Sequence, residues 1–281
     1  MEIYPEHSYP AMEFDLDINY IWEEPNDNFV HHDILRLPDG NYLSIVETTE
    51  NHHVPNNGPW YWSCISQWGA FICDGDYFPW VGDKLVIWDK DTKAEKWSWS
   101  TFDYFNISDY DSSTWSSSTP LDKGYFDWTH VNAFYFDDID SSIYISTRNL
   151  SRITKLKYPS GNIIWDMGLD MVSGDVEFGH DLGFSHQHSI SVLENGNILI
   201  FDNGKYSDEY WGANPLQSRA LEIKISNNNG QYSAEIVWDY VLPPELFGPD
   251  AGNVQKLSNG NYLVTSSAPP GTSLEVTTDK V

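Results

Sequence analysis

Short apolar runs of strand length recur along this chain, and turn sequences such as Asp39-Gly40 and Asn195-Gly196 separate them. Gly preceded by Asp or Asn is a common hairpin turn, and apolar runs bounded by such turns are typical of β-strands. No segment keeps an apolar period of 3.6 residues over several turns, as an amphipathic helix would. We therefore predict an all-β fold.

One unit, a pair of strands around a turn, occurs four times. The four copies begin near residues 31, 130, 188 and 252. The first three are followed by two further strands, which we place within 83–100, 152–168 and 219–240. Four short antiparallel strands per repeat are typical of a β-propeller blade. We expect residues 1–281 to form a single propeller domain with an aromatic-rich insertion at about 50–80.

The fourth repeat ends at residues 273–281 without its last strand, while residues 16–24 near the N-terminus resemble such a strand. Either this strand completes the last blade, or the chain is a fragment of a larger, six-bladed propeller. Four blades lie at the low end of the range for propellers. We expect that the chain is a fragment of the larger propeller.

Aligning the turn glycines places histidines at one repeat position. His32 and His188 lie eight residues before Gly40 and Gly196, and we assign His130 to the same position on the assumption of a longer turn in its repeat. The fourth repeat has Gly252 there. Equivalent positions of successive blades converge on the propeller axis, so the three histidines should share a pocket. His186 is on the same strand face as His188, whereas His31, His52, His53 and His180 are interpreted as ordinary structural or surface residues.

Arg148 follows the second strand of its repeat, where the other repeats have Glu47 and Asn203. Imidazole is a common metal ligand, but an arginine beside it would oppose a dication. Guanidinium donors match paired oxygens of a sulfate or phosphate. The pattern therefore favours an oxyanion site over a metal site.

Acidic residues outnumber basic ones by 42 to 15, which gives a net charge of -27. Such a field repels nucleic acids and anionic membranes. An anionic substrate would need cations gathered locally, as Arg148 and the histidines would provide.

The sequence has no apolar stretch of transmembrane length and no visible signal peptide, so we expect no membrane insertion. Its composition suits an exported protein, and we expect a periplasmic or secreted location. Cys64 and Cys73 could form a disulfide or remain two buried thiols. The oligomeric state is left open.

Two segments resemble the bacterial arylsulfate sulfotransferase family of propeller enzymes. Residues 127–149 are similar to its D-W-x-H-x-N segment with the S-x-R strand that follows, and residues 185–204 to its Q-H segment ending in F-D-N-G. The resemblance covers roughly residues 16–281. It implies transfer of a sulfuryl group from an aryl sulfate to a phenolic acceptor by a ping-pong mechanism, without cofactor or metal.

The resemblance also implies roles for individual residues. His188 corresponds to the histidine that is sulfated in the family, and His130, His32 and Arg148 to the other catalytic residues. Asn132 and Arg148 are expected to bind the sulfuryl oxygens. Two other functions stay open on the residues alone: a non-catalytic propeller that binds a ligand or protein, and a metal-dependent propeller hydrolase.

Overall fold

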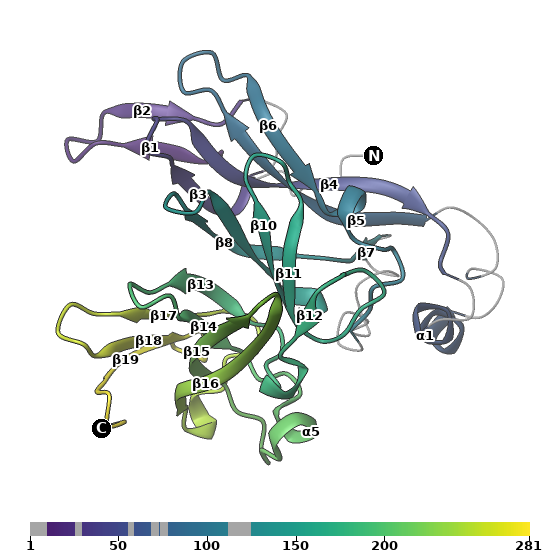
Figure 1. Ribbon diagram of the computed structural model, residues 1–281, viewed down its shortest axis with the longest axis vertical. Helices are drawn as coiled ribbons and strands as arrows, with labels where there is room; N and C mark the ends of the chain where they lie inside the picture. The colour runs from purple at the N-terminus through teal and green to yellow at the C-terminus, as the bar shows by residue number, and fades with distance from the viewer. Residues whose placement is uncertain (1–9, 26–29, 56–58, 69–72, 74–77, 112–124) are drawn as a thin grey trace. The chain divides into compact units, whose positions relative to one another are not determined.

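The computed structural model describes residues 10–25, 30–55, 59–68, 73, 78–111 and 125–281. Strands dominate the described chain and its helices are few and short (Figure 1), so the predicted all-β class is confirmed. The chain divides into two compact units, Met1–His130 and Val131–Val281. The single propeller domain and its number of blades stay predictions. None of the described helices has the length and apolar character needed to cross a membrane.

The first unit is built on an antiparallel sheet whose four main strands follow chain order, with a short fifth strand parallel to the third. These strands are β3 (Val30–Arg36), β4 (Tyr42–His52), β5 (Phe78–Trp88), β6 (Glu95–Ser100) and β7 (Phe126–Asp127). The described part of this unit also contains a separate hairpin, β1 (Met12–Phe14) and β2 (Tyr20–Glu23), and the helices α1 (Pro59–Trp68) and α3 (Thr101–Tyr104). The hairpin predicted from residue 31 onward is β3 and β4.

The aromatic insertion contains the helix α1, which the apolar pattern did not predict. Trp60 and Cys64 lie one turn apart and are buried, whereas Trp62 is 61% exposed. Apolar residues thus lie on both faces of this short helix and hide its amphipathic period. Cys64 forms a disulfide with Cys73, and their Cα atoms are 5.9 Å apart. Residues 56–58, 69–72 and 74–77 of the predicted insertion lie outside the described chain.

The second unit contains three sheets, of five, four and three strands. The first holds β8 (Val131–Asp137), β9 (Ser142–Thr147), β10 (Arg152–Lys157), β11 (Ile163–Gly168) and β12 (Glu177–Phe178). The second holds β13 (His188–Val192), β14 (Ile198–Asp202), β15 (Arg219–Asn228) and β16 (Gln231–Val241), and the third β17 (Gly252–Lys256), β18 (Tyr262–Ser266) and β19 (Thr272–Val276). Short helices connect them: η1 (Arg148–Leu150), η2 (His180–Leu182), α5 (Ser207–Trp211) and η3 (Pro244–Leu246).

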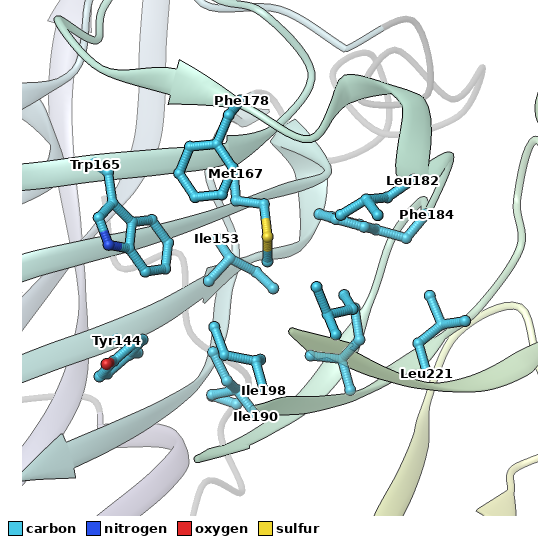
Figure 2. Packing of buried hydrophobic residues seen from close by; sticks show 13 residues of the cluster. Tyr144, Ile153, Trp165, Met167, Phe178, Leu182, Phe184, Ile190, Ile198 and Leu221 are labelled. Carbon is cyan, nitrogen blue, oxygen red and sulfur yellow. The ribbon is translucent and has the colours of Figure 1, made fainter. Parts of the chain in front are cut away.

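A continuous apolar core joins the first two sheets of this unit (Figure 2). Ile153 and Met167 of one sheet are fully buried, as are Ile198 and Leu221 of the other. Burial of each such side chain stabilises the folded state by about 1.5–3 kcal/mol. The core therefore holds the first strands of both sheets, β8 and β13, in place, and these strands carry or adjoin the predicted site residues of this unit.

Candidate functional site

The first unit contains a cavity of about 320 Å³ that is rich in titratable side chains. Its lining residues are His31, His32, Glu47, Val81, Asp83, Tyr125, Asp127 and His130. The sequence predicted His32 and His130 as site residues, and the structure brings them together, with ring centroids 4.9 Å apart.

His31 and His32 form a chain of contacts that ends on a buried carboxylate. The Nδ1 atoms of the two histidines are 2.6 Å apart, within hydrogen-bonding distance. The Nε2 atom of His31 lies 3.1 Å from Oδ1 of Asp83, whose side chain is 3% exposed. The other oxygen of Asp83 accepts a hydrogen bond from the Thr129 hydroxyl. The interpretation of His31 as an ordinary structural residue therefore misses its place in this chain of contacts.

His130 is oriented by a second carboxylate. Its Nδ1 atom lies 2.7 Å from Oδ2 of Asp127, which is three residues earlier in the chain. His32 and His130 both have left-handed backbones, with φ of 60° and 52°. This conformation is uncommon for residues other than glycine and costs on the order of 1 kcal/mol or more. Packing around the cavity therefore holds both histidines in conformations that an isolated strand would avoid.

Glu47 lies opposite Asp83 on paired strands β4 and β5. Burial raises the pKa of Glu47, and the nearby charges of Asp83 and Asp127 raise it further, while His31 and His130 lower it. The cavity thus combines carboxylates and imidazoles that can exchange protons. Among the described residues, no group of three or more His, Cys, Asp or Glu side chains is arranged to hold a metal ion.

In the second unit, His188 begins strand β13 and is buried. Its Nδ1 atom lies 2.8 Å from Oδ1 of Asn203. The Asn203 amide nitrogen donates to the Gly248 carbonyl at 2.6 Å, and this bond fixes which end of the amide faces His188. An amide oxygen can only accept a hydrogen bond, so Nδ1 of His188 carries the hydrogen. In the neutral ring the lone pair is then on Nε2.

Gln187 and Asn132 position the segment that carries His188. The Gln187 amide nitrogen donates to Ser146 Oγ and to the Thr147 and Arg152 carbonyls at 3.0 to 3.2 Å. The Asn132 amide nitrogen donates to the Gln187 carbonyl at 2.8 Å. Its oxygen is buried without a hydrogen-bond partner among the described residues. Asn132 therefore contacts the backbone next to His188, besides the substrate role expected of it.

Arg148 lies directly after β9, at the first position of η1. One guanidinium nitrogen donates to the Asn149 side chain at 2.8 Å. Another lies 3.5 Å from a carboxylate oxygen of Asp250, whose side chain is 77% exposed. A solvated ion pair of this kind contributes little stability, so an anionic ligand could replace Asp250 at low cost.

Strand pairing corrects the repeat alignment of His130. In the third repeat, His188 lies two residues before Ile190 on β13. Phe134 pairs with the residue two positions before the end of β9, and Ile190 pairs with the residue two positions before the end of β14, so Phe134 and Ile190 are equivalent. Asn132 lies two residues before Phe134. Asn132 therefore has the repeat position of His188, and the predicted match of His130 to His188 is wrong.

The length of the turn is the physical reason. Residues 138–141 join β8 to β9, whereas residues 193–197 join β13 to β14. The turn that the sequence pattern suggested to be longer is in fact the shorter one. His130 corresponds instead to His186, and the two share a left-handed backbone, with φ of 52° and 55°.

The predicted site residues thus form two groups, one in each unit. His32 and His130 share the cavity of the first unit, and His188, Asn132 and Arg148 belong to the second unit. Sequence reasoning missed His31, Glu47, Asp83, Asp127 and Asn203 as site residues. Asp127 and Asn203 were within reach, because they belong to the D-W-x-H-x-N and F-D-N-G segments. Glu47 has the repeat position of Arg148 and His31 directly precedes His32, whereas for Asp83 we find no local signal.

Comparison with known proteins gives one family. A family model described as Arylsulfotransferase (ASST) matches residues 71–279. The chain matches none of the curated proteins. Among solved structures, it is similar to a protein of unknown function from Bacteroides caccae, with 18% identity and a TM-score of 0.36 over 69% of this chain and 54% of that one. It is also similar to the WD40 domain of SCAP from fission yeast, with 8% identity and a TM-score of 0.27 over 70% of this chain and 39% of that one. The chain thus spans about half the length of the first of these structures.

Proposed function

Because this chain belongs to the arylsulfotransferase (ASST) family, we propose that it transfers a sulfuryl group from an aryl sulfate ester to a phenolic acceptor. The transfer takes place in two steps through a sulfated histidine, as in other covalent group transfers. His188 is the nucleophile. No cofactor or metal takes part in either step.

In the first step, the Nε2 lone pair of His188 attacks sulfur and the bond between sulfur and the phenolic oxygen breaks. The departing oxygen takes a proton from His32 or His130, which act as general acids. In the second step, the oxygen of an acceptor phenol attacks the same sulfur and the nitrogen–sulfur bond breaks. The proton of the acceptor hydroxyl returns to the histidine that gave one up, so the enzyme is restored.

The contact between His188 and Asn203, which selects one tautomer, is the observation that carries this proposal. Asn203 accepts from Nδ1 at 2.8 Å, and the Gly248 carbonyl prevents the amide from turning over. A neutral imidazole oriented in this way presents its nucleophilic nitrogen at one defined position. Arg148 and Asn132 belong to the same unit, and we assign the binding of the sulfuryl oxygens to the guanidinium N–H groups and to the second amide N–H of Asn132.

A burst experiment tests this function. Incubation with 4-nitrophenyl sulfate and no acceptor should release one equivalent of nitrophenol and leave one sulfuryl group on His188, which peptide mass spectrometry would locate. His188→Ala should abolish both the burst and the adduct. The matched control is His186→Asn, because asparagine tolerates the left-handed backbone at this position, where φ is 55°.

Each of the other outcomes has a defined meaning. An adduct on His186 would keep the reaction but move the nucleophile. Release of nitrophenol in a single phase, with no adduct on a folded protein, would contradict the covalent mechanism. Absence of any release would favour a binding protein without catalysis.

The location and the architecture are part of the same proposal. The disulfide between Cys64 and Cys73 supports a periplasmic or secreted protein, because disulfides persist in oxidising compartments. In the strand sets β3–β6, β8–β11 and β13–β16, a hairpin is followed by two further antiparallel strands, a pattern that supports four-stranded blades of a propeller.

A further inference from the structure

We propose that His31, held by Asp83, is the proton store for His32, and that the pair switches Nε2 of His32 between accepting and donating a proton. The inference rests on the proposed sulfuryl transfer. It concerns only residues of the first unit, and it makes His31 and Asp83 positioning residues for the catalytic His32.

Asp83 determines the protonation of one nitrogen of His31. The carboxylate is buried, and the Thr129 hydroxyl donates to one of its oxygens. Nε2 of His31 lies 3.1 Å from the other oxygen, close enough for a charge interaction but outside hydrogen-bond geometry. A ring nitrogen that directed its lone pair at a carboxylate over this distance would be repelled. Nε2 of His31 therefore carries a hydrogen.

The contact between the two rings then has two states. Nδ1 of His31 and Nδ1 of His32 are 2.6 Å apart and share one hydrogen. When the pair is neutral, the hydrogen belongs to His32, and the Nε2 lone pair of His32 can accept a proton. When the pair holds one extra proton, His31 carries hydrogens on both nitrogens, and Nε2 of His32 carries a hydrogen that it can donate.

This switch matches the needs of the two transfer steps. In the first step, Nε2 of His32 gives its proton to the departing phenolic oxygen, and the hydrogen between the rings moves from His31 to His32. In the second step, Nε2 takes the proton of the acceptor phenol, and the hydrogen between the rings moves back to His31. The extra positive charge is thus held on His31, next to a carboxylate, and away from the reacting oxygen.

Carboxyl side chains from three strands lie around the pair. Besides Asp83 from β5, the cavity is lined by Glu47 from β4 and Asp127 from β7. Asp127 itself pairs with His130 at 2.7 Å. The pair thus shares its cavity with three carboxyl side chains.

Leaving-group dependence tests the proposal. 4-Nitrophenolate is stable without a proton, whereas the oxygen leaving from phenyl sulfate needs one. His31→Gln and Asp83→Asn should slow the burst from phenyl sulfate by about tenfold or more and change the burst from 4-nitrophenyl sulfate much less. His52→Gln is the matched control, because His52 also lies near a carboxylate, Glu50 at 3.0 Å, but on the exposed part of β4.

The ratio of the two rates in one sample does not depend on how much of a variant is folded, so a destabilised variant still gives an answer. Equal slowing with both donors would overturn the proton store and leave a purely structural role for His31. A wild-type protein that shows no burst with 4-nitrophenyl sulfate would instead overturn the proposed function itself.

Discussion

Imidazole has two nitrogens, and in this protein a neighbouring side chain determines which of them carries the hydrogen. Asn203 does so for His188, and its own amide is oriented by the Gly248 carbonyl at 2.6 Å. A second acceptor, the His186 carbonyl, lies 3.1 Å from Nδ1 of His188 and works in the same direction. The nitrogen that we propose as the nucleophile is therefore defined before substrate binds, which would lower the reorganisation needed for reaction.

Replacing Asn203 tests this orientation. Asn203→Leu keeps most of the side-chain volume but removes the nearer of the two acceptors for Nδ1 and leaves only the His186 carbonyl at 3.1 Å, so the preference for this tautomer is weakened. We expect the burst rate with 4-nitrophenyl sulfate to fall by about 10- to 100-fold, the range found for other groups that orient a functional histidine. The adduct should still form on His188, and rapid-quench kinetics would measure its rate.

Asn259→Ala is the control, because Asn259 is exposed. In the described chain, its amide nitrogen donates a hydrogen bond only to Glu275. A folded Asn203→Leu variant with the wild-type burst rate would show that the tautomer is set by other groups.

The carboxylate of Glu222 on strand β15 forms hydrogen bonds that reach the neighbouring sheet. It accepts from the Tyr262 hydroxyl on β18 at 2.6 Å and from the Asn197 amide at 2.6 Å. Burial alone raises the pKa of Glu222, but these hydrogen bonds outweigh burial and hold the pKa below its ordinary value of 4.5. The ionised form is thus favoured in the folded state, and its bonds link two sheets of the second unit.

The stability contributed by Glu222 should depend on pH in a defined way. A carboxyl with a lowered folded pKa stabilises the protein above its ordinary pKa and loses this contribution as the pH falls through the folded value. Glu222→Gln should lower the free energy of unfolding by about 1–3 kcal/mol at pH 7. The difference from wild type should shrink as the pH falls below 4.5.

Urea unfolding at several pH values would measure this difference. Glu235→Gln serves as the comparison, because Glu235 forms only an exposed ion pair with Lys224 at 2.8 Å in the described chain. A constant difference between wild type and Glu222→Gln from pH 7 to pH 3 would contradict the lowered pKa of Glu222.

At the scale of the whole molecule, a net charge of -27 surrounds a site that we propose to bind an anion. The long-range field opposes the approach of an aryl sulfate, and only local cations such as Arg148 attract it. Salt shortens the reach of this field from about 30 Å at 0.01 M to about 8 Å at 0.15 M ionic strength.

We therefore expect the KM for an aryl sulfate to fall by about two- to tenfold over that range of ionic strength. The KM for an uncharged phenolic acceptor should hardly change, and it serves as the internal control. Steady-state kinetics with both substrates would measure the two values. A donor KM that rises with salt would show that local cations dominate the approach of the substrate.

The sequence alone was enough to predict the all-β class, the hairpins and the family. Turn glycines and strand-length apolar runs act on near neighbours, so the hairpins β3–β4, β8–β9, β13–β14 and β17–β18 could be read directly. The D-W-x-H-x-N and Q-H segments are continuous, and the family that they indicate is confirmed by the match over residues 71–279. The choice of His188 as the nucleophile comes from the same segments and stays a prediction.

Only the tertiary structure decided which side chains meet across the sheets. Asp83 reaches His31 because β3 pairs with β4 and β4 with β5, a relation between residues far apart in sequence. The equivalence of Asn132 and His188 depends on a turn length that the composition of the turn does not reveal. The hydrogen positions that we assign to the histidines follow from acceptors such as Asn203 and Asp83. The sequence contains no distances between residues, so such contacts cannot be inferred from it.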